Sequence, residues 1–430
     1  MMMRFLCGVF LMMVSVAAGE RPNVLLILSD DQAWGDYGFM GHEAVETPAL
    51  DKLAGESLTY TRGYVSSPLC RPSLASIFLG LPTHEHGITG NDFALPGGRK
   101  VPNNGRATPE FAPWHESLYA RFGQNEGLAH LLGEAGYLSL QTGKWWEAEP
   151  SRFGFTHAMT HGDPRRGGRH GDEGLKVSRE GIAPVRAFLD EAAKAKKPFF
   201  IWHAPFLPHT PHNPPADLFA KYRQRTESDH VARYWAMCEW FDQTCGELLG
   251  ELDKRGLREN TVVIYVCDNG WIQREDARSY DKRSKRSPYE GGIRTPIMLR
   301  WPGGGVAAVK DEETLVSSTD IAPTILRACG LEVPGRMKGI DLRERERLAE
   351  RGRIFGTAFD HDIAGPERTL ENLHARYVVQ GNWKLIDWAE GQAELYHLGK
   401  DPGERENLAE LHRTKVTELR ALLDAWWRPE

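Results

Sequence analysis

The sequence predicts an α/β protein: a large, mostly parallel sheet sandwiched by helices, with a smaller C-terminal α+β subdomain containing a short antiparallel sheet. Continuous apolar runs, typical of strands buried on both faces, recur as far as residue 270. Amphipathic stretches with helix-start and helix-stop residues lie between those runs. Shorter strand-like runs with turns between them follow near the C-terminus. These three observations together indicate the fold class.

Four apolar runs are the expected strands of the large sheet. They are rich in β-branched and aromatic residues and are short for helices. Two of the runs end in acidic and amide side chains, which matters below for the expected site. The four runs cover residues 23–32, 137–146, 197–205 and 261–270.

Helices are expected between these strands. Pro48 after the cap residue Thr47, and Pro72 further on, suit the first turn of a helix, where proline's missing N–H costs nothing. Gly136 and Gly256 suit helix ends. The expected helices cover residues 47–57, 72–80, 126–136 and 231–256.

The C-terminal part has a different pattern. Strand-like runs at residues 353–360, 375–387 and 393–398 are separated by turns, and 375–387 suggests a hairpin. A final helix is expected over residues 414–427. The charged run at 341–353 interrupts the apolar pattern, although it equally suits a solvated helix within one unit. The predicted organisation is a signal peptide over 1–19, a catalytic domain over 20–340 and a C-terminal subdomain over 341–430.

Composition excludes some classes of function. The 430 residues carry a formal net charge of −6, with acids and bases mixed along the chain. A nucleic-acid-binding surface would show a strong basic excess, so no nucleic-acid partner is expected.

The N-terminus has the pattern of a secretory signal. Arg4 precedes a short apolar run, and small residues surround Gly19. That run is short for a membrane span, and no later segment is long and apolar enough to be one. We therefore expect a soluble exported protein, periplasmic or extracellular, with no integral membrane segment.

Five cysteines follow the expected signal peptide, and an odd number fits no complete disulfide framework. Cys238 and Cys245 lie seven residues apart on an expected helix, roughly 10 Å at 1.5 Å per residue, which is too far for a disulfide. Most of these thiols are expected to be buried and to fill space in the core. Because at least one cysteine stays unpaired in an expected exported protein, that cysteine is a candidate for a functional role.

Polar side chains close two of the expected strands. Asp30 and Asp31 follow one strand, and Asp268 and Asn269 follow another. In open parallel sheets, ligands bind outside the carboxyl ends of the strands. Either each acid caps its own turn, or the group holds a cation. Two such pairs at equivalent strand ends favour a Ca²⁺ or Mg²⁺ site, because hard oxygen donors suit these ions.

Cys70 is expected at the start of the helix that contains Pro72. Free backbone amides and the helix dipole favour negative charge at such a position. A thiol there can have a lowered pKa and can lie beside an anionic substrate. The other interpretation is a cysteine that only packs against its neighbours.

Eight motifs occur in an order that resembles type I sulfatases, which belong to the alkaline-phosphatase-like superfamily. The resemblance covers nearly the whole chain after the expected signal, and its most specific parts are the sixth and the eighth of the motifs in the next sentence. In chain order the motifs are PNVLLILSDD, SSPLCRPSLAS, TGKWW, PHTP, CDNG, YEGGIRTPIMLRWPG, STDIAPTIL and ELYHLGKDPGERENL.

The resemblance implies a formylglycine-dependent site. In the family, a maturation enzyme oxidises the cysteine that matches Cys70 to formylglycine, whose hydrate attacks sulfur and later expels sulfate. Residues matching Lys144 and Lys285 bind the sulfate oxygens, and the histidine matching His209 lies near the leaving-group oxygen. The motif register favours Lys285 over Lys282, and His209 over two neighbouring histidines. The family's metal, usually Ca²⁺, is held by residues matching Asp30, Asp31, Cys70 (in its modified form), Asp268 and Asn269.

These roles agree with the chemistry of a sulfate ester. Negative charge grows on the leaving oxygen during cleavage, and a metal ion and two ammonium groups stabilise that charge. A histidine can supply the proton that the leaving alcohol needs. A covalent intermediate divides the reaction into two easier steps.

Two residues depart from the family pattern. Leu74 stands where the family has an arginine that helps the maturation enzyme recognise the motif and holds the formylglycine. Trp146 stands where the family has a histidine that can deprotonate the nucleophile. His170, in a glycine-rich loop, is the candidate replacement.

Three functions are therefore weighed. The first is hydrolysis of a sulfate ester on a carbohydrate or aryl compound. The second is hydrolysis of a phosphodiester or phosphonate, because the same cationic pocket suits phosphoryl esters. The third is non-catalytic binding of a sulfated glycan. The retained metal ligands and lysines favour the first, and tryptophans near the expected site make a sugar plausible.

Overall fold

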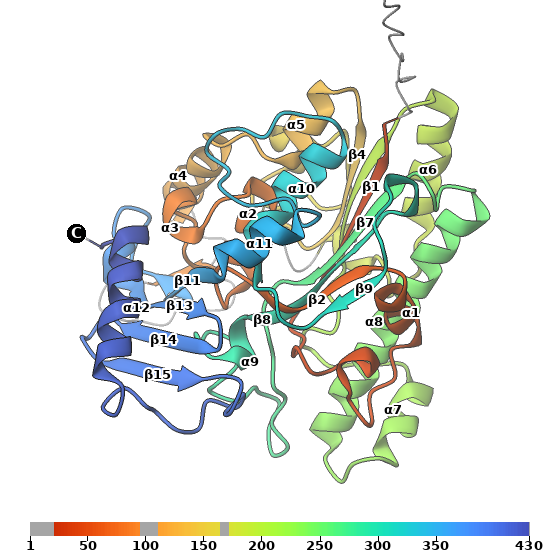
Figure 1. The fold of residues 1–430 in the computed structure, drawn as a ribbon. Coiled ribbons are helices and arrows are strands. Elements are labelled where there is room, and N and C mark those ends of the chain that lie inside the picture. The colour runs from red at the N-terminus through yellow and green to blue at the C-terminus, as the bar shows by residue number, and fades with distance from the viewer. Residues whose placement is uncertain (1–20, 95–110, 164–171, 430) are drawn as a thin grey trace, which may run out of the picture.

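The computed structural model describes residues 21–94, 111–163 and 172–429 of the chain. A large sheet crosses the molecule with helices on both faces, and a separate small sheet lies beside it (Figure 1). This arrangement confirms the predicted fold class. The expected signal peptide lies outside the described residues, and the domain boundary near residue 340 stays a prediction.

The large sheet has nine strands in the order β10-β2-β8-β7-β1-β6-β4-β5, with β9 also paired to β2. Strand β1 pairs in parallel with β6 and β7, whereas β8 runs antiparallel to both β7 and β2. All four strands expected from the sequence belong to it. The strands are β1 (Asn23–Ser29), β2 (Leu58–Tyr64), β4 (Leu138–Gly143), β5 (His157–Ala158), β6 (Phe199–Ala204), β7 (Thr261–Cys267), β8 (Arg294–Arg300), β9 (Val309–Asp311) and β10 (Val316–Ser317).

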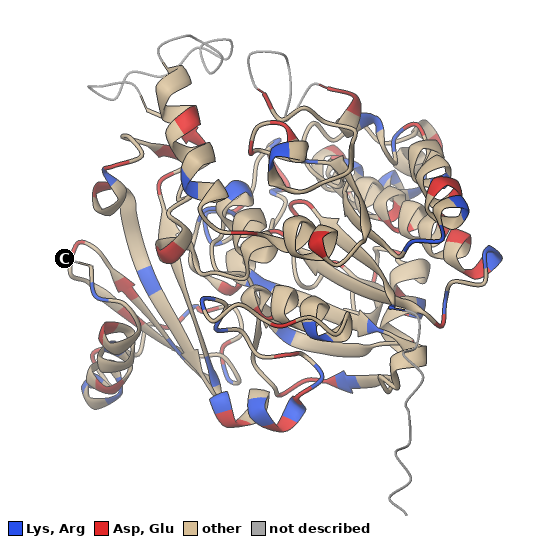
Figure 2. Cartoon of the chain, turned by 90° about the horizontal axis from the view of Figure 1, so that it is seen from above, with Lys and Arg blue, Asp and Glu red and all other residues tan. Residues whose placement is uncertain are grey.

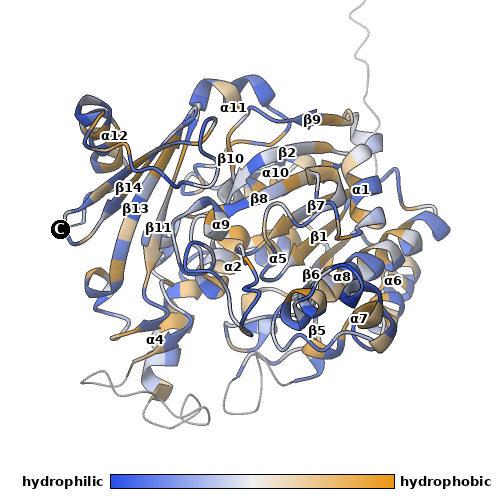
Figure 3. Cartoon of the chain, turned by 90° about the horizontal axis from the view of Figure 1, so that it is seen from below, coloured by the Kyte–Doolittle hydropathy of each residue, from blue (hydrophilic) through white to orange (hydrophobic). Residues whose placement is uncertain are grey.

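Helices cover both faces of this sheet because successive β1 side chains point to opposite sides. Val24 and Leu26 pack in the core cluster shared with α2, α4, α5 and α10, and Leu25 and Ile27 in the cluster shared with α1, α6 and α8. Figure 3 shows hydrophobic colouring along the central strands β1 and β7 and more hydrophilic colouring at the peripheral loops. The helices are α1 (Pro48–Gly55), α2 (Cys70–Leu79), α3 (Thr83–His86), α4 (Ala112–Gly123), α5 (Leu128–Glu134), α6 (Ala183–Ala195), α7 (Ala216–Arg223), α8 (Asp229–Lys254), α9 (Glu290–Ile293), α10 (Ile321–Ala328), α11 (Arg345–Arg351) and α12 (Arg413–Trp426).

The expected helices are present with shifted ends. Helix α2 begins at Cys70, two residues before the proline expected to start it, and α8 begins at Asp229. Thr47 precedes α1 but makes no side-chain cap; its hydroxyl accepts from the Gly38 amide and donates to Asp51 instead.

The small sheet is antiparallel, in the order β11-β13-β14-β15. Strands β13 and β14 form the hairpin expected within residues 375–387. One face packs against α12 through Leu385 and Leu419, and the other packs against the large domain through Tyr377 and Tyr64. The four strands are β11 (Arg353–Phe359), β13 (Leu373–Gln380), β14 (Trp383–Trp388) and β15 (Ala393–His397).

A two-stranded pairing joins distant parts of the chain. Strand β3 (Asp92–Phe93) pairs in parallel with β12 (Asp362–Ile363). Just before them, the Asn91 amide donates to the His361 carbonyl oxygen over 2.9 Å. The C-terminal region is thereby attached to the segment that follows α3.

A buried ion cluster also joins the small sheet to the large domain. Lys384 on β14 is inaccessible to solvent, and its ammonium lies 3.1 Å from the Glu290 carboxylate of α9 and 2.7 Å from that of Glu404. The Tyr64 hydroxyl of β2 donates to Glu290 over 3.0 Å. Four segments therefore meet at one set of charges.

Surface charge and cysteine placement agree with the sequence. Figure 2 shows acidic and basic residues mixed over the elements. In the described part of the chain, no helix combines the length and the apolar character needed to cross a bilayer. The five cysteines there are all free and buried, as expected: Cys70, Cys238, Cys245, Cys267 and Cys329.

Candidate active site

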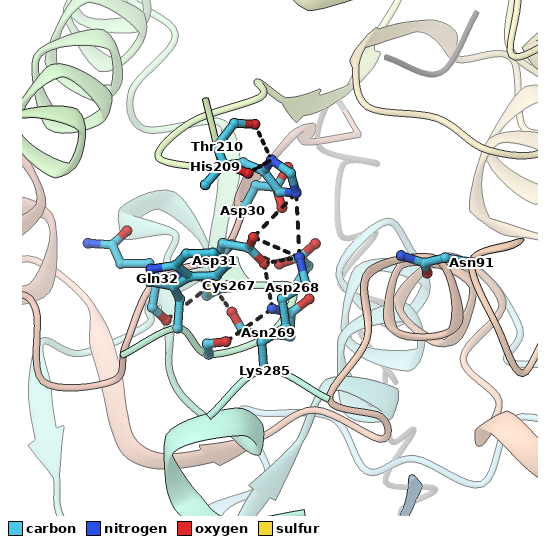
Figure 4. Close-up of polar contacts among 12 residues, drawn as sticks. Asp30, Asp31, Gln32, Asn91, His209, Thr210, Cys267, Asp268, Asn269 and Lys285 are labelled. Atoms are coloured by element: carbon cyan, nitrogen blue, oxygen red, sulfur yellow. Dashed lines mark hydrogen bonds and ion pairs between the residues drawn. The ribbon is translucent and has the colours of Figure 1, made fainter. Parts of the chain in front are cut away.

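Four side chains meet at the carboxyl ends of β1 and β7. Because these strands are adjacent and parallel, Asp30 and Asp31 lie beside Asp268 and Asn269, and all four are buried. The Asp31 amide donates to Asp268 Oδ1 over 3.2 Å, and Asn269 Nδ2 donates to Asp31 Oδ1 over 2.7 Å. Figure 4 shows this group. The structure brings together the two pairs of ligands expected from the sequence.

Two lysines neutralise these carboxylates. Lys144 Nζ, just beyond β4, lies 2.8 Å from each oxygen of Asp30 and 3.7 Å from Asp268. Lys285 Nζ, in the loop before α9, lies 2.6 and 2.7 Å from the oxygens of Asp31. Both are buried, and for each the attraction of the carboxylates outweighs the cost of burial and raises the pKa. Both ammonium groups therefore stay charged.

His209 lies beside the same carboxylates. Its Nε2 is 3.3 Å from Asp31 Oδ2 and 3.4 Å from Lys285 Nζ, and its Nδ1 is 2.6 Å from the Thr210 carbonyl oxygen. Because a carbonyl only accepts, Nδ1 carries the ring proton and Nε2 faces the site with a lone pair. The ring stacks on Phe206. Burial, followed by the two lysines, lowers the pKa of His209 well below its usual value.

The neighbouring histidines lie elsewhere. His203 is buried within the sheet, 3.1 Å from Thr142 Oγ1 and 3.3 Å from Ser178 Oγ. His212 packs its ring against Trp271 at the side of the site. Of the three histidines in this segment, His209 is the one whose ring nitrogen lies at the carboxylates.

Cys70 is the first residue of α2 and lies in the same place. Ligand atoms of Asp30, Asp31, Cys70 and His209 all lie within 4.8 Å of one another. The thiol is 1% exposed, and burial raises its pKa to about 12 despite the two lysines. The expectation that the helix N-terminus lowers this pKa was wrong, because desolvation outweighs the dipole and the ammonium groups. As a thiol, Cys70 would be an uncharged and weak nucleophile.

The donor set fits a divalent cation. Asn269 Oδ1 and Asp268 Oδ2 are buried, and neither accepts a hydrogen bond from any residue that the structure describes. Buried oxygens normally have partners, so these two are available for a cation. When all three carboxylates are ionised, they and the two ammonium groups sum to a charge of −1, and without a cation burial raises the pKa of Asp30 and Asp268. A hard divalent cation such as Ca²⁺ or Mg²⁺ matches both the donors and the charge.

Comparison with known families decides the family. A family model described as Sulfatase matches residues 22–331. The chain belongs to the sulfatase family. A second model, described as N-sulphoglucosamine sulphohydrolase, C-terminal, matches residues 276–425. This membership confirms both the resemblance found in the sequence and the predicted enzyme class, a sulfuric ester hydrolase.

Individual sulfatases are similar over most of their length. N-acetylgalactosamine-6-sulfatase of Canis lupus familiaris is 28% identical, and the match covers 91% of this chain and 82% of the relative. N-acetylgalactosamine-6-O-sulfatase of Bacteroides thetaiotaomicron is 23% identical, covering 94% and 93%. The crystal structure of Ps i-CgsB in complex with k-i-k-neocarrahexaose shares the fold, with a TM-score of 0.73, 21% identity, and coverage of 95% of this chain and 93% of that one.

The sulfatase has an apolar side chain at position 74. Leu74 is buried in α2 and lines a small cavity together with Phe122 and Trp145. The nearest arginine in the motif, Arg71, points away from Cys70: its guanidinium makes a bidentate, buried ion pair with Glu147 at 2.6 and 2.7 Å. Arg71 therefore does not replace the missing arginine.

Trp146 forms a wall of the sulfatase site. Its ring lies 5.8 Å from Lys144 Nζ, and it lines the same cavity as Cys70. The candidate replacement for the family histidine, His170, lies outside the described residues. A different histidine, His361, also lines this cavity.

The cavity lined by Cys70, His209 and Lys285 has a volume of about 780 Å³, within the usual range for ligand sites. Several lining residues were not anticipated from the sequence. Asn91 and His361 are 270 positions apart, and no motif marked them. The arginines of the basic loop before α9 were visible in the sequence, but such loops are usually just solvated. The unanticipated lining residues include Asn91, Arg233, Arg278, Arg286 and His361.

Proposed function

We propose that this sulfatase hydrolyses a sulfate ester on a carbohydrate, using formylglycine formed from Cys70 and a divalent cation held by the acids of β1 and β7. The observation that supports it most is the convergence of three buried carboxylates, two buried ammonium groups and residue 70, of which Cys70 and Lys285 line one cavity. Two of the similar proteins above are named as sulfatases of N-acetylgalactosamine, which supports a carbohydrate substrate.

The cation would be Ca²⁺ or Mg²⁺, bound by Asp30, Asp31, Asp268, Asn269 and residue 70. When bound, it would supply positive charge beside the sulfo group. The orphaned oxygens of Asp268 and Asn269 support this ligand set. Cation binding also neutralises the carboxylates that now hold the two lysines.

The protein's own side chains would then bind and orient the ester. Lys144 and Lys285 donate hydrogen bonds to the sulfo oxygens, and because both are buried these charge-assisted bonds are strong. His209 lines the cavity, and its Nε2, once protonated, can supply the proton that the leaving oxygen needs. Trp146 and Phe206 exclude water from the ammonium of Lys144.

Formylglycine would supply, as its hydrate, one hydroxyl that attacks sulfur and a second that expels sulfate. The burial of Cys70 supports the need for this conversion, because an unmodified thiol with a pKa of about 12 is a weak nucleophile. A maturation enzyme that accepts leucine at position 74 is the implied partner.

One experiment tests the proposal. The sulfatase is purified from its native host, the peptide containing Cys70 is examined by mass spectrometry for formylglycine, and sulfate release from an aryl sulfate is measured. We expect conversion of residue 70, sulfate release, and no release by Cys70→Ala. An intact thiol together with no sulfate release would refute the proposal. Faster hydrolysis of a matched aryl phosphodiester would favour phosphoryl transfer instead.

A second candidate function is non-catalytic binding of sulfated glycans. Leu74 and Trp146 favour it, since both replace polar groups of the family motif by apolar ones that cannot exchange protons. This alternative predicts tight glycan binding without turnover, even when formylglycine is present.

We also propose that the sulfatase is exported, on the basis of the apolar segment that follows Arg4. N-terminal sequencing of the protein from its native host tests this. Cleavage near Gly19 is expected. Protein that is found only in the cytoplasmic fraction and still begins at Met1 would contradict export.

A further inference from the structure

The cavity of the sulfatase has a cationic wall beyond the sulfo-group site. Arg233, Arg278 and Arg286 all line it, whereas Asp92 is the one acidic side chain among the described residues that do so. The whole chain carries a net charge of −6. The excess of positive charge is therefore a local property of this cavity and not of the surface in general.

No acidic residue that the structure describes pairs with these three arginines. In the part of the chain that the structure describes, none of them lies within 4.0 Å of a carboxylate oxygen, although most other arginines do. Arg278 and Arg286 are exposed, and Arg233 is half-buried with its guanidinium 4.2 Å from the Phe219 ring. Their charge is available to a ligand.

The loop that carries Arg278 is held by its own hydrogen bonds. Gln273 Nε2 donates to the carbonyl oxygens of Ala277 and Ser279 over 2.8 and 3.0 Å, and the Trp271 indole donates to Gln273 Oε1 over 3.1 Å. Because these bonds lie within the loop, Arg278 is presented by a defined turn. Preorganisation of this kind lowers the entropic cost of binding.

The same loop is attached to the helix that carries Arg233. The Ser228 hydroxyl, at the start of α8, donates to the Glu275 carbonyl oxygen over 2.5 Å. On the other side, the Arg286 amide donates to the Pro68 carbonyl oxygen over 2.9 Å, close to Cys70 in the chain. The three arginines thus belong to connected segments around one opening.

Arg274, four residues before Arg278, provides a comparison within the same loop. Arg274 makes a bidentate ion pair with Asp276 at 2.8 and 2.6 Å, is exposed, and does not line the cavity. Of the two arginines between Gln273 and Ser279, Arg274 is neutralised at the surface, and Arg278 lines the cavity with no acidic partner among the described residues.

We propose that Arg233, Arg278 and Arg286 form a second anion-binding subsite, which selects glycans that carry a second anionic group beside the ester that is cleaved. This inference rests on the proposed function for the position of the first sulfate. Sulfate and uronate carboxylate groups share the chemistry that guanidinium groups bind, by paired charge-assisted hydrogen bonds. The rings of Trp271 and Tyr280, 4.8 Å apart on the same wall, offer apolar surface to the sugar between the two anions.

Binding is the appropriate measurement, because it does not depend on turnover. The Cys70→Ala protein is titrated calorimetrically with three tetrasaccharides: a galactan with two sulfates, a galactan with one sulfate, and a uronate-containing chain with one sulfate. We expect at least one of the two-anion ligands to bind roughly tenfold or more tightly than the singly sulfated galactan. Which of them does so distinguishes sulfate from carboxylate.

Variants then locate the effect. In the Cys70→Ala background, Arg278→Gln and Arg233→Gln are expected to remove most of that preference, and Arg278→Lys to retain part of it. Arg274→Gln, the control on the same loop, is expected to keep the full preference. Thermal unfolding of each variant checks that it folds like its parent.

Three results would overturn the subsite: equal affinity for all three ligands, no binding of any of them, or a preference that survives in both arginine variants. Failure of the proposed function gives a different result. If the unmutated protein releases no sulfate from an aryl sulfate but the arginine-dependent preference persists, the subsite stands and the hydrolytic function does not.

Discussion

At the scale of single residues, Asp31 connects the groups that the proposed chemistry needs. It accepts a hydrogen bond from Asn269, forms an ion pair with Lys285 and lies close to the ring of His209. These three groups come from three separate segments. A carboxylate with this many neighbours fixes their relative positions. The consequences for metal binding and for stability can be measured separately.

Cation binding should stabilise the folded sulfatase. Since the unfolded chain has no assembled site, a Ca²⁺ concentration of 100 times the dissociation constant is worth about 2.7 kcal/mol of unfolding free energy. We predict that the melting temperature rises with Ca²⁺ and falls with a chelator, and that Asp268→Ala largely removes this response. Differential scanning fluorimetry measures it.

The control for this prediction is a second acidic group. Glu126, His130 and Glu134 also lie close enough to share an ion, but they lie at the surface. Glu134→Gln should keep the full response to Ca²⁺. A melting temperature that is the same in Ca²⁺ and in chelator would contradict the proposed site.

The Arg71–Glu147 pair gives a prediction about stability. Both side chains are almost inaccessible, so removing one charge leaves the other buried without a partner. Glu147→Gln should lower the unfolding free energy by about 3–5 kcal/mol. The exposed Arg152–Glu116 pair is the control, and Arg152→Gln should cost less than about 1 kcal/mol. Equal effects of the two variants in urea unfolding would be inconsistent with this account.

At the scale of elements, α2 is held by its contact with α3. The Ile88 amide donates to His86 Nδ1 over 3.1 Å, so the proton of the neutral ring is on Nε2, which is 2.8 Å from Ser76 Oγ of α2. Burial lowers the pKa of His86 to about 3. The helix that begins with Cys70 is therefore fixed by a histidine that must stay neutral.

This contact predicts a dependence of stability on pH. In the unfolded chain the histidine pKa is near 6.5, so between about pH 6.5 and 3 the unfolded state binds a proton that the folded state does not. The contribution of His86 is complete above this window and is lost as pH falls through it, by at most about 1.4 kcal/mol per pH unit. Urea unfolding at several pH values gives the unfolding free energy as a function of pH. This free energy should change less steeply with pH for His86→Gln than for the unmutated protein. His130→Gln, on the surface, should keep the original slope.

The elements that could be predicted are those whose pattern is local. The four apolar runs were recognisable because their residues are almost continuously apolar, as expected for a strand that is buried on both faces. Strand β2 was not, although it is equally buried, because its sequence LTYTRGY contains polar residues and glycine. Thr59 and Arg62 find their partners only in the folded chain, at the carbonyl oxygens of Ala54 and Gly381.

The same distinction applies to the site. Asp30, Asp31 and Asp268 end apolar strands, so their proximity followed from the parallel sheet. Asn91 and His361 belong to no strand pattern of useful length, and a pairing of two residues on each side brings them together. The pKa of Cys70 was mispredicted because a helix start is visible in a sequence and the depth of burial is not.

At the scale of the whole molecule, the buried Lys384 cluster joins the small sheet to the loop that carries Lys285. Glu290 begins α9, five residues after Lys285, and Lys384 and Glu404 come from the C-terminal region. Loss of the lysine would leave two buried carboxylates facing each other. Burial raises the pKa of Glu404 even with Lys384 in place.

We predict that Lys384→Met lowers the unfolding free energy by about 3–5 kcal/mol. Because the cluster spans both sheets, calorimetry should show one transition at a lower temperature for the variant. Lys415→Met, which breaks an ion pair with Glu418 on the surface of α12, should change the transition little. Two separate transitions in the unmutated protein would show that the sheets unfold independently.

The short pairing of β3 with β12 gives the C-terminal region a share in the cavity. His361 precedes β12 and lines the opening together with Cys70, which begins α2 nearly 300 positions earlier. Chimeras between relatives that exchange only their C-terminal regions should therefore change the part of the cavity wall that His361 forms, while the three arginines and the nucleophile stay with the large sheet. The fold thus lets one part of the sugar-facing wall diverge without disturbing the reacting groups.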